Sequence, residues 1–95
     1  MKTEAHLQAH LFRRAREHDI YCRKMASVGR VGFPDVLLAR AGRVVFVELK
    51  NPSGTGTLSE MQKREIRRLK DAGAQVYVVD SKEGVENVIR QIADA

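Results

Sequence analysis

Apolar residues recur at helical spacing in three stretches of the chain. The first stretch covers residues 4–18, with Thr3 placed as its N-cap. The second begins near Ser59, where a Ser-x-x-Gln run matches a capping box, and ends at Gly73, while the third begins at Ser81. The apolar positions of the three stretches are Leu7, Leu11 and Ala15, then Met61, Ile66, Leu69 and Ala72, then Val85, Val88, Ile89 and Ile92. The pattern therefore predicts three amphipathic helices.

Shorter apolar runs between these helices predict four strands, at residues 20–28, 36–40, 43–50 and 75–79. The second and third strands, joined by Ala41-Gly42, carry Val and Leu at consecutive positions, which is typical of central strands covered on both faces. The resulting order is α-β-β-β-α-β-α. We therefore expect one α/β domain over residues 1–95, in which helices flank a mixed four-stranded sheet.

The composition indicates a folded, basic protein. Hydrophobic residues make up 43 %, and 17 Lys and Arg against 12 Asp and Glu give a net charge of +5. This excess favours a polyanionic partner, with nucleic acid as the first candidate and a merely basic surface as the alternative. The single cysteine, Cys22, excludes an intramolecular disulfide. The charged N-terminus is unlike a signal peptide and the apolar runs are too short for a bilayer, so we expect a soluble, cytoplasmic protein with no membrane partner.

Two carboxylates are predicted to face each other across the second and third strands. If Arg40 pairs with Arg43 across a two-residue connection, Asp35 lies opposite Glu48. Side chains in a strand alternate between the two faces, so Lys50 shares the face of Glu48. Opposed carboxylates repel each other and destabilise a strand pair unless a cation lies between them. Carboxylate oxygens suit a hard cation such as Mg²⁺, and a neighbouring ammonium suits phosphate chemistry.

This prediction depends on the turn between the two strands. Ala41 is disfavoured in a type I′ turn, which needs positive φ at both central positions, and a bulge at Gly42 would shift the pairing by one residue. Each group also has a structural alternative. Glu48 and Lys50 could form an ion pair at the sheet edge, and Asp35 could be a turn carboxylate after proline.

The run Gly32-Phe33-Pro34-Asp35, followed after twelve residues by Glu48-Leu49-Lys50, resembles the motif of the PD-(D/E)XK nuclease superfamily. More narrowly, the chain resembles the VRR-NUC family, in which a helical Glu precedes the motif and a Gln lies on the following helix. Glu4 and Gln62 occupy those places, and the run Gly56-Thr57-Leu58-Ser59 leads to Gln62. The resemblance covers nearly the whole chain and implies a restriction-endonuclease-like αβββαβα core.

The resemblance also implies roles for single residues. The implied ligands of a catalytic Mg²⁺ or Mn²⁺ are Asp35, Glu48, the Leu49 carbonyl and Glu4. Helical periodicity alone favours a different role for Glu4, as a first-turn acid interacting with the helix dipole. Lys50 would be the catalytic lysine. Gln62 would lie near the metal or the phosphate, although its role in the capping box stays open.

Stand-alone members of the family resemble Holliday-junction resolvases, which implies a homodimer that cuts branched DNA. The alternative is a non-catalytic DNA-binding module that retains the nuclease fold. Near the motif, Arg23, Lys24 and Arg30 are the cations we expect to contact DNA phosphates. His6 and His10 have the spacing of metal ligands but no evident third ligand, so we expect both to face solvent.

Overall fold

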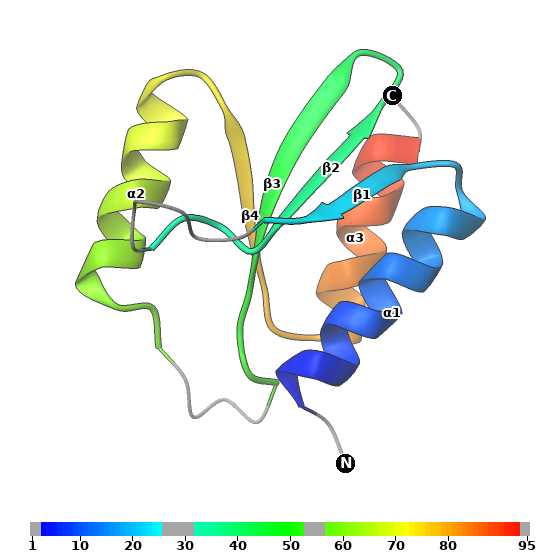
Figure 1. The fold of residues 1–95 in the computed structure, drawn as a ribbon, viewed down its shortest axis with the longest axis horizontal. Helices are drawn as coiled ribbons and strands as arrows, with labels where there is room; N and C mark the ends of the chain where they lie inside the picture. The colour runs from blue at the N-terminus through cyan, green and yellow to red at the C-terminus, as the bar shows by residue number, and fades with distance from the viewer. Residues whose placement is uncertain (1–2, 26–31, 53–56, 94–95) are drawn as a thin grey trace.

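The computed structural model describes residues 3–25, 32–52 and 57–93, within which three helices and a four-stranded sheet form (Figure 1). The elements are α1 (Glu4–Glu17), β1 (Tyr21–Lys24), β2 (Val36–Arg40), β3 (Arg43–Leu49), α2 (Glu60–Asp71), β4 (Gln75–Val79) and α3 (Lys82–Ala93). The predicted order and mixed α/β fold are confirmed. The first strand is shorter than predicted and ends at Lys24, and positions 26–28 of that prediction lie outside the described residues.

The sheet has the order β1-β2-β3-β4, with antiparallel pairs up to β3 and a parallel pair between β3 and β4. Arg40 pairs with Arg43, as the two-residue connection predicts. Ala41 and Gly42 both have positive φ, at 53° and 83°, which is the backbone of a type I′ hairpin turn. The alternative with a bulge at Gly42 is therefore wrong, and the strand register overrides the steric preference of Ala41.

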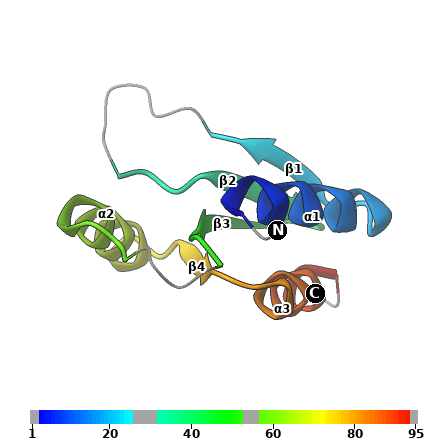
Figure 2. The ribbon, with the colours of Figure 1, turned by 90° about the horizontal axis from the view of Figure 1, so that it is seen from below.

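One face of the sheet forms the core with α1 and α3, which lie together on that side, while α2 lies on the other (Figures 1 and 2). The core-facing strand residues are Val36, Leu38, Val45, Val47, Leu49 and Val79, and the helices contribute Leu7, Leu11, Ala15, Val85, Val88, Ile89 and Ile92. Because strand side chains alternate, Phe46 and Glu48 point to the α2 side. Because β3 is a buried strand, the charged side chain of Glu48 lies in a largely enclosed position.

An ionic contact joins α1 to α3 beside this core. Glu86 of α3 accepts hydrogen bonds from Nε and Nη2 of Arg14, each at 2.9 Å, and lies 3.2 Å from His10 Nε2. His10 is thus held between the helices, and its predicted solvent-facing position is wrong because packing of α1 on α3 brings it over Glu86. His6 is exposed, as predicted.

The face that α2 covers is only partly closed, and the predicted burial of both sheet faces is wrong there. Val44 and Val78 keep 50 % and 44 % of their surface exposed, because α2 packs mainly along β4. The predicted apolar side of α2 is also narrower than expected. Met61 is 50 % exposed and Ala72 is exposed, since each lies roughly 120–140° around the helix from buried Ile66. None of the helices in the described ranges has the length and apolar character that a membrane crossing requires.

Candidate active site

The hairpin and the segment before it bring Asp35 beside the end of β3. Val36 pairs with Val47, and continuing this register by one residue places Asp35 opposite Glu48. The Oδ2 atom of Asp35 accepts a hydrogen bond from the main-chain N–H of Leu49 at 2.9 Å. This bond ties the Asp35 carboxylate to the β3 backbone next to Glu48. The predicted juxtaposition of the two carboxylates therefore holds.

Glu48 is a buried carboxylate whose two oxygens differ in their surroundings. Its side chain is 2 % exposed, and its Oε1 atom has no hydrogen-bond partner among the described residues. Burial is the largest effect on this group and raises the pKa of Glu48 to about 8. Three further effects act in the same direction: the negative charge of Asp35, a hydrogen bond shared with Asp35 when a proton is present, and the charge of Glu4.

This arrangement fits a divalent cation. An isolated buried carboxylate is costly to ionise, and a second carboxylate beside it adds repulsion. Asp35 and Glu48 offer hard oxygen donors of the kind that Mg²⁺ or Mn²⁺ prefers, and Oε1, to which no described residue hydrogen-bonds, supplies a ligand position. A divalent cation bound here would offset both the cost of ionising the buried carboxylate and the repulsion between the two carboxylates.

The side chain of Gln62, in the first turn of α2, contacts Glu48. Its Nε2 donates a hydrogen bond of 2.8 Å to Glu48 Oε2. Its Oε1 accepts from the Ser59 main-chain N–H at 2.8 Å, while Ser59 Oγ accepts from the Gln62 main-chain N–H at 3.1 Å, which completes the predicted capping box. The two alternatives for Gln62 are therefore both realised in its contacts, as a helix cap and as a neighbour of the candidate metal ligand.

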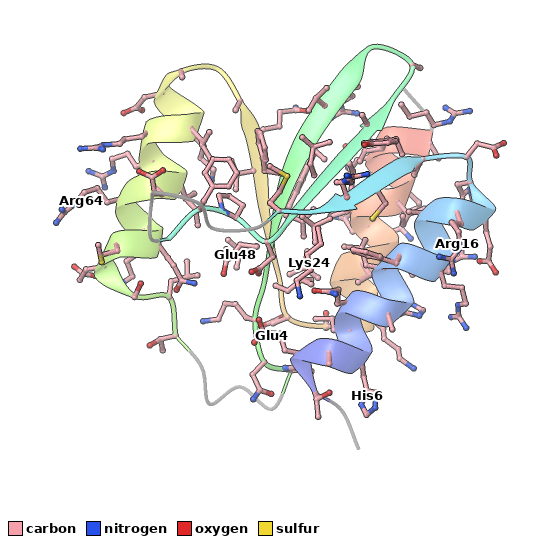
Figure 3. The ribbon with its side chains drawn as sticks, in the orientation of Figure 1. Glu4, His6, Arg16, Lys24, Glu48 and Arg64 are labelled. Carbon is pink, nitrogen blue, oxygen red and sulfur yellow. The ribbon has the colours of Figure 1, made fainter. Side chains whose placement is uncertain are left out.

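Lys50 and Glu4 complete the surroundings of the carboxylates. The positive charge of Lys50 lowers the pKa of Glu48, against the stronger opposing effects, so the ammonium lies near the site. Glu4 is exposed in the first turn of α1 and lies at the same end of the sheet as Glu48 (Figure 3). No three His, Cys, Asp or Glu side chains in the described ranges form a ready-made metal cluster. Glu4 is thus close enough for its charge to act on Glu48, but these three carboxylates do not form a ready-made metal site.

These groups line one hollow of about 150 Å³. Its lining residues are Glu4, Asp35, Glu48, Leu49, Lys50, Asn51, Thr57, Leu58 and Gln62. Every predicted ligand and catalytic residue is among them, so residues far apart in the sequence meet at one place. The sequence did not predict three of these lining residues as site residues, namely Asn51, Thr57 and Leu58. Only their position next to the motif and the capping box could have indicated them.

A close backbone contact positions α2 against the segment that carries Asp35. Gly32 has a φ of +93°, and a Cβ atom there would lie 2.8 Å from the carbonyl oxygen of Met61. Only glycine fits this approach without displacement. The absence of a side chain at Gly32 thereby allows α2, which carries Gln62, to pack close to the segment that carries Asp35. The sequence pattern did not indicate this role.

The predicted phosphate-binding cations have different outcomes. Arg23 and Lys24 are exposed at the end of β1. The next residue, Met25, donates a main-chain hydrogen bond of 2.7 Å to the carbonyl oxygen of Asp35. Lys24 therefore ends its strand beside the segment that carries Asp35. Arg30 lies outside the described residues. A contact of these cations with DNA remains a prediction.

Comparisons with known proteins agree with the motif. A family model described as the VRR-NUC domain matches residues 2–83. A solved structure described as a VRR_NUC domain is similar to this fold with a TM-score of 0.83 and 32 % sequence identity, over 95 % of this chain and 97 % of that chain. A search among curated proteins finds no significant match. The resemblance predicted from the motif residues is confirmed.

Proposed function

Since the chain belongs to the VRR-NUC family and is a nuclease-type domain, we propose that it is a metal-dependent endodeoxyribonuclease. The observation that carries this proposal is the buried Glu48 carboxylate, which lies beside Asp35 and has one oxygen without a hydrogen-bond partner in the described part of the chain. A protein that only binds DNA gains nothing from two adjacent carboxylates near phosphates, because they repel its ligand.

The residues of the hollow divide the work of phosphodiester hydrolysis. Asp35, Glu48 and the Leu49 carbonyl would hold Mg²⁺ or Mn²⁺, with Glu4 as a further ligand from α1. When bound, the ion supplies activation of water and polarisation of the scissile phosphate. The ammonium of Lys50 orients the attacking water and stabilises negative charge that develops on the phosphate. Exposed Arg23 and Lys24 position DNA through its backbone phosphates.

The proposed substrate is branched DNA such as a four-way junction, cut by a homodimer. One hollow of this size serves one strand, and paired cuts on a symmetric junction require two sites related by a two-fold axis. Sedimentation of the protein alone and with junction DNA tests this part. A dimer in both conditions is expected, and a monomer that cuts only one strand would contradict it.

The test of the activity is cleavage of a labelled four-way junction and a matched linear duplex in Mg²⁺, Mn²⁺ or chelator. We expect paired, metal-dependent cuts in the junction only. Cuts in both substrates would support a nuclease without structural preference. A folded, DNA-binding protein that cuts neither substrate with either metal would contradict the proposal and favour the non-catalytic module.

Lys50→Ala separates catalysis from binding in the same assay. This variant is expected to fold and bind DNA normally, because Lys50 lies after the end of β3. It is expected to lose cleavage, because the substitution removes the ammonium group from the hollow. Lys82→Ala, an exposed lysine at the start of α3, is the matched control and should cleave normally. Unimpaired cleavage by Lys50→Ala would contradict the assignment of its role.

A further inference from the structure

The amide group of Gln62 is held at both of its ends, and Ser59 holds one of them. We propose that Ser59 is a positioning residue of the active site: its main-chain N–H fixes the Gln62 amide so that Nε2 faces Glu48. Glu48 Oε1 is thereby kept for the metal. The inference rests on the proposed function, because it takes Glu48 as a metal ligand.

The hydrogen bonds allow only one orientation of this amide. Ser59 N donates to Gln62 Oε1 at 2.8 Å, and Gln62 Nε2 donates to Glu48 Oε2 at 2.8 Å. With Glu48 ionised, as a metal ligand must be, turning the amide by half a rotation would place its NH₂ against the Ser59 N–H and its oxygen against the Glu48 carboxylate. Two donors and two acceptors would then face each other, and both hydrogen bonds would be lost. The helix cap therefore determines which atom Glu48 meets.

The consequence reaches the candidate metal ligand. Because Oε2 of Glu48 is occupied by Gln62, the carboxylate is held in one rotation, with buried Oε1 unpartnered among the described residues. Groups that hydrogen-bond to a metal ligand set its orientation, and their loss typically weakens metal binding about 10–100-fold. Ser59 would affect the Glu48 carboxylate indirectly, through its hydrogen bond with Gln62.

The backbone of Ser59 offers a selective way to remove the N–H. Its φ is −70°, which proline adopts without strain. Ser59→Pro removes both the N–H and the hydroxyl, while Ser59→Ala removes only the hydroxyl that caps α2. Ser81→Ala is the matched control, because the Ser81 hydroxyl accepts from the Gly84 N–H at 3.0 Å at the start of α3 and does not line the hollow.

The experiment is calorimetric titration of each variant with Mn²⁺, together with kcat and KM for junction cleavage. Ser59→Pro should weaken Mn²⁺ binding about tenfold and lower kcat, with KM for DNA unchanged. Ser59→Ala and Ser81→Ala should stay within about threefold of the wild type. Gln62→Met, which keeps the Ser59 hydroxyl bond to the α2 backbone, should lose about 10–100-fold in Mn²⁺ affinity.

Equal Mn²⁺ affinity of Ser59→Pro and Ser59→Ala would overturn the inference, even if Gln62→Met binds weakly. If Ser59→Pro does not fold, hydrogen exchange of the Ser59 amide tests the inference instead. This amide should be protected in the metal-free wild type, and Gln62→Met should remove the protection. An unprotected Ser59 amide in the wild type would also overturn the inference. Absence of Mn²⁺ binding by the folded wild type would instead contradict the proposed function, and the inference with it.

Discussion

Glu48 combines a place near the end of an inner strand with a charge that the strand cannot solvate. β3 buries Val47 and Leu49 against the core, and the alternation between them turns Glu48 into the space under α2. In the metal-free protein the raised pKa of Glu48 means that folding favours the protonated form. Glu48, which we propose as a metal ligand, therefore destabilises the metal-free fold once the pH is high enough for its carboxyl group to ionise.

Stability in chelator should accordingly fall as pH rises. The pKa of Glu48 is raised from 4.5 to about 8, so the unfolded chain loses this proton at lower pH than the folded protein. The free energy of unfolding of the wild type therefore falls between these two pH values. Glu48→Gln, which stays neutral, should be more stable than the wild type at pH 9 by up to about 5 kcal/mol. At pH 4.5 the two should be nearly equal.

Urea unfolding at both pH values in chelator measures this difference. Added Mn²⁺ should reverse the order at pH 9, because it stabilises only the protein with the ionised Glu48. A wild type that is as stable as Glu48→Gln at pH 9 without metal would contradict the raised pKa.

The hairpin of β2 and β3 is the element that aligns Asp35 with Glu48, and its turn is strained. Ala41 has a φ of 53°, where a Cβ atom is unfavourable. Ala41→Asn places a residue suited to a type I′ turn before Gly42 and should raise the free energy of unfolding by about 0.5–1 kcal/mol. Chemical denaturation tests the change. A loss of stability would mean that the turn is not of this type.

The docking of α2 depends on Gly32, and Gly73 offers a control with the same backbone requirement. Both have positive φ, at +93° and +95°, but a Cβ atom at Gly73 would meet nothing within 4 Å. Gly73→Ala should cost about 1–2 kcal/mol from strain alone. Gly32→Ala should cost clearly more and should also slow cleavage, because α2 must move away from the Asp35 segment. Equal losses in stability and normal cleavage would contradict this role.

The sequence predicts the elements that depend on local patterns and misses the contacts that depend on packing. The cap at Ser59, the hairpin register and the meeting of Asp35 with Glu48 follow from periodicity and one pairing rule. The partial burial of His10 against Glu86 and the exposure of Val78 do not, because each depends on where a helix packs. The approach of Gly32 to α2 is likewise a tertiary contact.

At the scale of the whole molecule, α2 carries exposed arginines that form no ion pair with a described residue, beside the paired Lys63 and Arg68. Arg14 is paired with Glu86 and Glu17, whereas exposed Arg64 and Arg67 on α2 have no ion-pair partner among the described residues. The side chain of Arg64 extends away from the sheet (Figure 3). Unpaired cations on the helix that contacts the site are suited to DNA backbone phosphates.

Arg64→Ala and Arg67→Ala should each weaken DNA binding and reduce the slope of log affinity against log salt by about 0.9 per lost phosphate contact. Arg90→Ala, an exposed arginine on α3 in the other helical layer, should leave the slope unchanged. Fluorescence anisotropy in chelator at several salt concentrations measures the slopes. An equal effect of all three variants would indicate a general loss of charge and no defined binding face.

The uneven packing of the helices also has a consequence for motion. α1 and α3 pack on each other and on the strands, whereas α2 buries only Ile66 among its apolar side chains and packs mainly along β4. Native-state opening should therefore begin with α2, and its amides should be less strongly protected from exchange than the amides of α1 and α3. Each such opening separates Gln62 from Glu48. The accessibility of the buried carboxylate is thus governed by the stability of one helix, and the closed state is reached again only when α2 refolds on the sheet.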